Sequence, residues 1–193
     1  MFEPDFCYPE AGIWDNLFDD IFIYKIDAES NRYHWKLANV ANAKSYPHKL
    51  KGSHIFWGMT FLPNEEYPEI LKDILNHLLN NIVPKNYKLK SIHLNAQSLG
   101  QNGTCHTDAE PNSGELTLMV FINNRWQKEW GGDFQLLANY SNNADVVHSI
   151  PYVPGRVILF DATIPHRALA PNEPYVVRKS LVFRLEKNNE TNL

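Results

Sequence analysis

Residues 154–170 read PGRVILFDATIPHRALA, and this stretch decides which fold the sequence favours. It holds two short strand-like runs, at about 156–160 and 164–170, which are separated by a turn signal at Asp161. Six further runs of the same kind occupy about residues 88–97, 103–107, 116–123, 132–138, 145–150 and 177–185. Short strands at regular spacing predict a sandwich or barrel.

Eight antiparallel strands within one domain fit a jelly roll, which protects its sheet edges by stacking two sheets. We therefore expect a mostly β chain: a jelly roll, or double-stranded β-helix, of eight core strands with a supporting N-terminal helix and extra strands. The 193 residues are expected to form a single domain. Within it, residues 1–87 form a supporting and substrate region, 88–186 the catalytic core and 187–193 a tail.

The N-terminal half shows weaker patterns. Residues 1–20 are interpreted as an irregular arm, and two strands are expected at 21–24 and 33–37, paired across a turn at 28–31. A further strand is expected at 54–62. One helix is clear, because its apolar residues share one face at helical spacing between two prolines. These residues are Ile70, Leu71, Ile74, Leu75, Leu78, Leu79 and Ile82, between Pro68 and Pro84. The helix should lie against the outside of a sheet.

Composition narrows the functional classes. The chain is 44% hydrophobic and 12% aromatic, as in globular proteins. The net charge is −4, and residues 1–30 carry eight acids and one lysine, so no strongly basic domain exists and nucleic acid is not expected as a partner. Cys7 and Cys105 suit a reducing compartment. The sequence shows neither a secretory signal nor an apolar run that could span a membrane, so we expect a cytoplasmic protein.

A candidate metal site is indicated by His106-Thr107-Asp108 and by His166. Residues two apart in a strand point to the same side, so His106 and Asp108 can reach one ion. His166 lies in the seventh expected strand, which neighbours the second strand in a jelly roll. Two histidines and one carboxylate form the set associated with non-haem Fe(II) oxygenases, although this ligand set alone also fits zinc.

A candidate anion site is indicated by Arg178, which begins the last strand, and by Ser180 on the same face. A guanidinium fork with a nearby hydroxyl suits the far carboxylate of an oxo-acid whose other end would chelate the metal. A dicarboxylate anchor favours an oxygenase over the alternative of a non-oxygenase, cupin-like metal-binding protein, which has no need of it.

Residues 91–185 resemble the 2-oxoglutarate and Fe(II)-dependent dioxygenase superfamily, in particular its prolyl-4-hydroxylase-like branch. Five blocks in a specific order and spacing carry the resemblance: HTD (106–108), LTLMVFINNRW (116–126), WGGDFQLL (130–137), PGRVILFDATIPH (154–166) and RKSLVFRL (178–185). The resemblance implies that His106, Asp108 and His166 bind Fe(II) and that Arg178 anchors 2-oxoglutarate. It implies O2 as a further co-substrate, and ascorbate is a candidate cofactor.

Two places depart from the hypoxia-type prolyl hydroxylases, which hold tyrosines against the co-substrate. Here these places hold Ala96 or Gln97 and Phe121, so the contact must be made otherwise. Asn95, Gln97, Thr117 and Ser180 are the polar candidates for binding 2-oxoglutarate. Ser91, His93, Asn95 and Gln97 alternate as a polar face, which either lines the pocket or faces solvent. His148 is an alternative ligand to His166, although the family has no ligand at that place.

The resemblance implies hydroxylation of an amino-acid side chain, with release of succinate and carbon dioxide. Peptidyl proline competes as the substrate with a free amino acid or small metabolite, and the sequence does not distinguish the two. Halogenating relatives lack the carboxylate ligand, so Asp108 favours hydroxylation.

Overall fold

The computed structural model describes residues 2–8, 11–39, 55–141 and 143–188. Among them, the first half contributes β1 (Phe6–Tyr8), β2 (Ala11–Trp14), α1 (Asp20–Ser30), β3 (Lys36–Asn39), β4 (Phe56–Phe61) and α2 (Glu69–Asn81). The second half contributes β5 (Tyr87–Gln97), β6 (Leu116–Phe121), the 3-10 turn η1 (Lys128–Trp130), β7 (Phe134–Leu137), β8 (Val146–Ile150), β9 (Val157–Asp161), β10 (His166–Ala168) and β11 (Arg178–Lys187).

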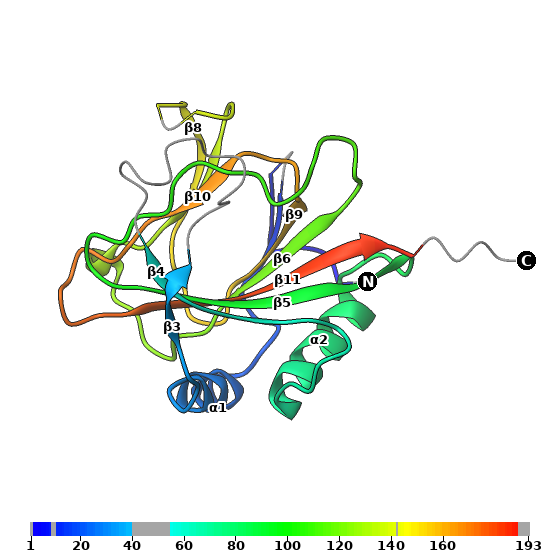
Figure 1. Cartoon of the computed structure of the whole chain (residues 1–193), viewed down its shortest axis with the longest axis horizontal. Helices are drawn as coiled ribbons and strands as arrows, with labels where there is room; N and C mark the ends of the chain where they lie inside the picture. The colour runs from blue at the N-terminus through cyan, green and yellow to red at the C-terminus, as the bar shows by residue number, and fades with distance from the viewer. Residues whose placement is uncertain (1, 9–10, 40–54, 142, 189–193) are drawn as a thin grey trace, which may run out of the picture.

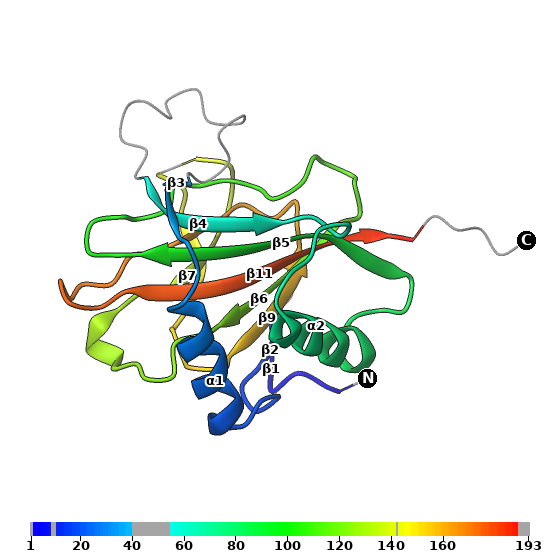
Figure 2. The ribbon, with the colours of Figure 1, turned by 60° about the horizontal axis from the view of Figure 1, so that its bottom comes forward.

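These strands form two antiparallel sheets, as expected for a jelly roll. The large sheet has the order β1-β2-β9-β6-β11-β5-β4-β3, and the small sheet has the order β10-β7-β8. Both helices cover the same face of the large sheet, whereas the small sheet lies over its other face (Figures 1 and 2). A mostly β chain with a supporting helix is therefore confirmed.

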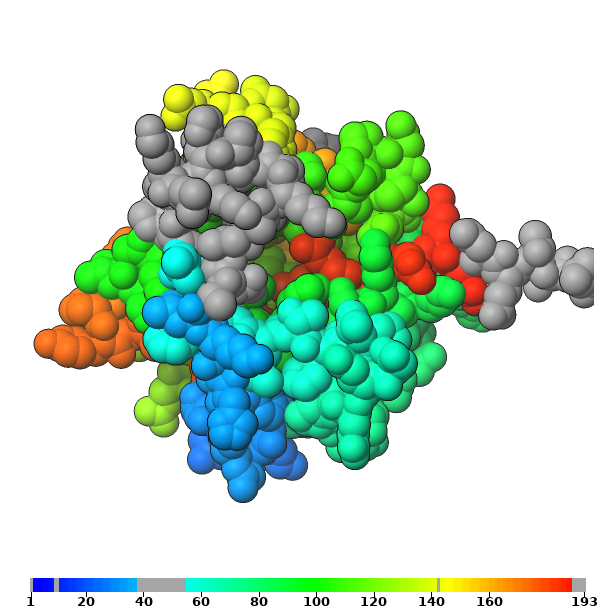
Figure 3. Space-filling view, viewed as in Figure 1, coloured from blue at the N-terminus to red at the C-terminus, as the bar shows by residue number. Residues whose placement is uncertain are grey.

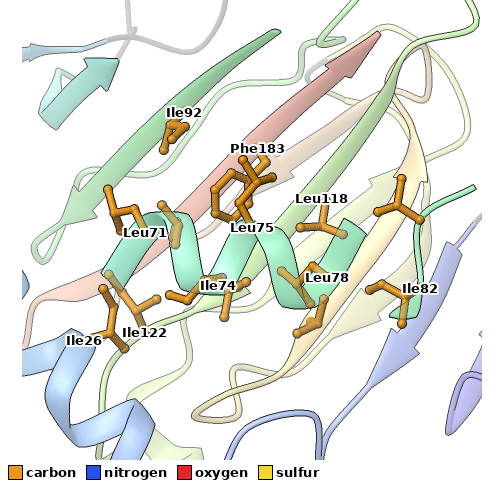
Figure 4. Close-up of a cluster of buried hydrophobic side chains, with 14 of the residues drawn as sticks. Ile26, Leu71, Ile74, Leu75, Leu78, Ile82, Ile92, Leu118, Ile122 and Phe183 are labelled. Carbon is orange, nitrogen blue, oxygen red and sulfur yellow. The ribbon is translucent and has the colours of Figure 1, made fainter. Parts of the chain in front are cut away.

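The helix between Pro68 and Pro84 is also confirmed as α2. Leu71, Ile74 and Leu78 are fully or almost fully buried, and they pack against the large sheet (Figure 4). Burial of such side chains contributes about 1.5–3 kcal/mol each. A second core, which includes Phe121, Phe134 and Phe160, lies between the two sheets. The site cavity opens within this second layer.

Three predictions for the first 40 residues are wrong. Residues 21–24 are not a strand but the first turns of α1, because Asp19 caps the helix by accepting a hydrogen bond from the Phe22 amide (2.7 Å). Ile23 and Ile26 are buried at helical spacing, whereas Ile21 is exposed. The expected turn at 28–31 is the end of α1, so the strand around 33–37, shifted to Lys36–Asn39 as β3, pairs with β4 instead. The expected irregular arm contains β1 and β2, and β2 pairs with β9.

Seven of the eight expected core strands form, with boundaries shifted by a few residues. The exception is 103–107, which makes only scattered contacts: Gly103 donates to the carbonyl oxygen of Ala168, and His106 forms an isolated bridge with His166. A side chain competes for the backbone here, because the His106 ring bonds the carbonyl oxygen of Thr104. The expected neighbourhood of His106 and His166 is nevertheless correct. Among the described residues, no helix is long and apolar enough to cross a membrane.

Candidate active site

The site lies between the sheets, on the inner faces of β5 and β11. Alternation along β11 places Leu181 and Phe183 in the helix-facing core, and Arg178, Ser180 and Arg184 toward the other sheet. The resulting cavity has a volume of about 290 Å³. Figure 3 shows atoms of β11, in red, between the green and cyan parts of the surface. The cavity is lined by Phe56, His93, Asn95, Gln97, Gly103, His106, Thr107, Asp108, Thr117, Met119, Phe134, Phe160, His166, Ala168, Arg178, Ser180, Val182 and Arg184.

His106, Asp108 and His166 converge in this cavity, with ligand atoms within 4.8 Å of one another. Asp108 Oδ1 lies 3.4 Å from His106 Nε2 and 3.2 Å from His166 Nε2. Metal–nitrogen bonds of about 2.0–2.1 Å place neighbouring ligands roughly 3 Å apart, so the spacing fits one small cation. The backbone supports this placement, because the His106 and His166 amides each donate to the other residue's carbonyl oxygen.

The hydrogen bonds of the two rings determine which nitrogen is free. His106 Nδ1 lies 2.9 Å from the carbonyl oxygen of Thr104, and His166 Nδ1 lies 2.7 Å from that of Ile164. A carbonyl oxygen only accepts, so each Nδ1 carries the hydrogen and each Nε2 presents a lone pair to Asp108. Lone pairs that face a carboxylate oxygen repel it unless a cation lies between them. The arrangement therefore fits a bound metal ion.

Burial keeps both rings neutral. It lowers the pKa of His166 from 6.5 to about 4 and lowers the pKa of His106 well below 6.5. Asp108 is oriented by Thr117, whose Oγ1 donates to Oδ2 at 2.7 Å and leaves Oδ1 directed at the rings. Outer partners of this kind hold metal ligands in a fixed orientation. Thr117, a candidate for binding the co-substrate, lines the cavity and also bonds Asp108.

Arg178 is the largest fully buried side chain of the described residues. Its Nε donates to the carbonyl oxygen of Gly132 (2.8 Å), and its Nη1 donates to Gln97 Oε1 (3.1 Å) and Ser180 Oγ (3.4 Å). Nη2 is buried without a partner in the described part of the chain. Burial lowers the pKa of Arg178 to about 10, so the group remains charged near neutral pH. A buried guanidinium with an unpaired N–H donor is suited to bind an anion.

Phe121, at one of the two places that lack a tyrosine, contacts Arg178. The Arg178 guanidinium lies over the Phe121 ring at 5.0 Å and over the Tyr152 ring at 5.3 Å. Gly132 lies close to Arg178 and has a φ of +80, and a Cβ there would lie 3.3 Å from Arg178 Cδ and 2.8 Å from Trp126. Glycine is therefore favoured at this position of the WGGDFQLL block, because a side chain would press against Trp126 and Arg178.

Comparison with known proteins agrees with this geometry. The family model described as the 2OG-Fe(II) oxygenase superfamily matches residues 92–184. Residues 92–184 are thus similar to the 2OG-Fe(II) oxygenase superfamily. The protein is accordingly an enzyme of this class, whose members use Fe(II), 2-oxoglutarate and O2. No curated protein matches the chain in sequence.

Solved structures share the oxygenase fold at low sequence identity. A Pseudomonas putida prolyl-4-hydroxylase has a TM-score of 0.62 and 13% identity, over 92% of each chain. A Trichoplax adhaerens prolyl hydroxylase in complex with a hypoxia inducible factor peptide fragment has a TM-score of 0.66 and 16% identity, over 94% of this chain and 85% of that one. The α-ketoglutarate dependent epimerase SnoN from nogalamycin biosynthesis has a TM-score of 0.67 and 13% identity, over 92% and 78%.

The structure resolves the orientation of the polar row on β5 of the oxygenase. His93, Asn95 and Gln97 line the cavity, so this part of the row faces inward and not toward solvent. His93 bonds Ser91 Oγ through Nε2 (2.8 Å) and Thr60 Oγ1 through Nδ1 (3.1 Å). Burial, with a smaller effect from Arg184, lowers the pKa of His93 to about 4.

His148, the alternative ligand, lies elsewhere in the oxygenase. It belongs to β8, and its ring stacks on Tyr8 with a centroid distance of 4.1 Å. The ligand cluster instead contains His166.

Arg184 is the one charged residue of the cavity that the sequence analysis missed. It forms an ion pair with Asp108 through Nη2, whereas its Nε and Nη1 are buried without partners among the described residues. Burial lowers its pKa to about 9, so it remains charged near neutral pH. The sequence could have indicated this residue, because residues two apart in a strand share a face. Arg184 is four residues beyond Ser180, so it lies on the same inner face as Arg178, Ser180 and Val182.

Proposed function

We propose that the protein is an Fe(II)- and 2-oxoglutarate-dependent dioxygenase that hydroxylates an amino-acid side chain. His106, Asp108 and His166 would hold the iron, and Arg178 would bind the far carboxylate of 2-oxoglutarate. The observation that carries the proposal is the combination, in one cavity, of converging Nε2 and Oδ1 atoms with a buried guanidinium whose Nη2 has no partner in the described part.

The chemistry supplied by bound Fe(II), 2-oxoglutarate and O2 is oxidative decarboxylation to succinate and carbon dioxide, coupled to substrate hydroxylation. The protein's own residues bind and orient these groups. Gln97 and Ser180 hold the Arg178 fork, and Thr117 holds Asp108. Phe134 and Phe160, which contact the His166 ring, provide an apolar wall that limits water near the metal.

For the substrate, both peptidyl proline and a free amino acid or small metabolite agree with this chemistry. The fold likeness to prolyl hydroxylases, one of them in complex with a peptide fragment, is compatible with peptidyl proline. The likeness to the epimerase SnoN from nogalamycin biosynthesis indicates that the fold also serves other reactions. A succinate-release screen over proline-rich peptides and free amino acids, with ascorbate as an optional reductant, separates the two substrate classes.

The direct test is anaerobic addition of Fe(II) and 2-oxoglutarate, which should produce a weak visible charge-transfer band. In Arg178→Gln, 2-oxoglutarate should bind about tenfold to hundredfold more weakly, because charge-assisted hydrogen bonds are lost. Metal affinity, measured with Fe(II) alone, should stay nearly unchanged. Absence of the band and of 2-oxoglutarate affinity in the unaltered protein would contradict the proposed function.

A further inference from the structure

Arg184 gives the cavity a second buried guanidinium that the proposed chemistry does not use. Its side chain is 21% exposed, and only Nη2 is engaged, at Asp108 Oδ1. Nε and Nη1 are buried and have no partner in the described part of the chain. Leaving charged donors unpaired in a buried place costs free energy, so these two groups are suited to receive an anion.

The charges of the cavity lead to the same conclusion. The charged residues that line it are Arg178, Arg184 and Asp108, which sum to +1. Histidines bind a metal as neutral rings, so His106 and His166 add nothing to this sum. His93 is neutral as well, because burial lowers its pKa to about 4. An Fe(II) ion and the 2-oxoglutarate dianion cancel each other. One positive charge therefore remains when both are bound, and a substrate with one negative charge would neutralise it.

The two arginines are placed for different anions. They lie on the same face of β11, six residues apart, so their Cα atoms are separated by roughly 20 Å. Arg184 is the one that contacts the metal ligand Asp108, whereas Arg178 is held at the other end by Gln97 and Gly132. A 2-oxoglutarate molecule that reaches from Arg178 to the metal leaves Arg184 for a second molecule.

The neighbours of Arg184 add polar groups for such a molecule. Ser91 is its β-sheet partner on β5, and the Ser91 hydroxyl holds the His93 ring, which lines the cavity. Val182, two residues before Arg184 on the same face of β11, provides apolar surface. This mixture of one cation, neutral polar groups and apolar surface suits a small organic acid.

We propose that Arg184 binds a carboxylate of the substrate, which is therefore a small carboxylic acid of the free amino acid type. The proposal rests on the proposed function, because it concerns the molecule that is oxidised. An anion at Arg184 lies beside the metal ligand, so the carboxylate must be only a few bonds from the oxidised carbon. An interior peptide residue has an uncharged amide at that distance, whereas a free amino acid has its α-carboxylate there.

The test compares each of a set of free L-amino acids with its L-amino acid amide, which differs in lacking the carboxylate charge. Protein loaded anaerobically with Fe(II) and 2-oxoglutarate is titrated, and binding is followed as a change of the charge-transfer band. We expect at least one acid to bind about tenfold to hundredfold more tightly than its amide. In Arg184→Gln protein that still forms the band with Fe(II) and 2-oxoglutarate, this preference should disappear.

Two further variants separate charge from structure. Arg184→Lys keeps the charge and loses the fork, so it should retain part of the preference for the acid. Arg167→Gln removes an arginine that bonds Gln135 and does not line the cavity, so the full preference should remain. If Arg184→Gln loses iron binding, the comparison of acid and amide in Arg184→Lys decides the question.

Equal binding of acids and amides, or binding of uncharged peptides but of no free acid, would overturn the proposal. So would a loss of 2-oxoglutarate affinity in Arg184→Gln that matches the loss in Arg178→Gln, because Arg184 would then serve the co-substrate. A wild-type protein that forms no band would instead contradict the proposed function. Calorimetry of the acids and amides on the metal-free protein would then decide the Arg184 proposal by the same comparison.

Discussion

The carbonyl oxygens of Thr104 and Ile164 determine how the two histidines can act. By accepting the Nδ1 hydrogens, they leave both Nε2 lone pairs directed at Asp108 Oδ1. Asp108 is in turn shared between Thr117 and Arg184. The candidate metal site therefore depends on residues that are not ligands, which restrict the ligands to one tautomer and one orientation.

A pair of histidine variants tests this assignment at the residue scale. His166→Ala removes one of three converging ligand atoms, so Fe(II) binding should be abolished, as measured by metal content after dialysis. His148→Ala removes a ring that stacks on Tyr8 outside the cluster, so it should bind iron like the unaltered protein. Loss of iron in His148→Ala with retention in His166→Ala would reverse the assignment.

The strand β11 connects the candidate site to the helix-facing core, because one of its faces lines the cavity and the other packs toward the helices. Its inner face carries Arg178 and Arg184, and its outer face carries Lys179 and the apolar core residues. Lys179 forms a buried ion pair with Asp27 of α1, and it also donates to Ser30 Oγ (2.8 Å) and Asn31 Oδ1 (2.9 Å). The C-terminal end of α1 is thus attached to β11, the strand that carries Arg178 and Arg184.

Breaking this attachment should be costly. Lys179→Met leaves the Asp27 carboxylate buried without its cation, so the free energy of unfolding should fall by about 3–5 kcal/mol in urea denaturation. Lys187→Met, at the exposed end of the same strand, should change it by less than about 0.5 kcal/mol. The double variant Asp27→Leu, Lys179→Met should recover much of the loss. Equal stabilities of Lys179→Met and Lys187→Met would show that the ion pair is not structural.

At the scale of the whole molecule, the large sheet separates two layers. The apolar core between this sheet and the helices is seen in Figure 4. The polar cavity lies on the other face of the sheet, toward the small sheet. The cavity contains three neutral histidines, and their burial affects the stability of the entire fold. His93 is the informative one, because it is not in the ligand cluster.

The pH dependence of stability follows from the lowered pKa of His93. In the unfolded chain this histidine binds a proton below pH 6.5, whereas in the folded chain it does so only below about pH 4. Stability of the metal-free protein should therefore be lost as pH falls from 6.5 to 4, by about 1.4 kcal/mol per pH unit for each such histidine. His93→Asn should reduce the slope, measured by urea denaturation at several pH values. An unchanged slope would mean that His93 is not neutral in the folded protein.

The sequence predicted those strands and helices whose formation depends on the periodicity of their own apolar residues and on nearby turn residues. The short strand-like runs and turn signals of residues 88–185 predicted eight core strands, of which seven form. The apolar stripe after Pro68 predicted α2, because burial of one face specifies the helical period. Residues 21–24 were misread, because an aromatic and β-branched run favours strands unless a cap and the neighbouring sheet select a helix. The first strands were missed for a related reason: β2 exists through its pairing with β9, about 145 residues away.

For the site, the sequence by itself determined the residue types and their spacing, which sufficed to predict His106, Asp108, His166 and Arg178 as one group. Only the tertiary structure decided what surrounds them. The Gly132 carbonyl, the Phe121 and Tyr152 rings and the ion pair of Arg184 with Asp108 all come from segments distant in sequence. A periodicity shows which side of a strand a residue occupies, whereas the partners across the cavity depend on how the two sheets stack, and no local pattern encodes that.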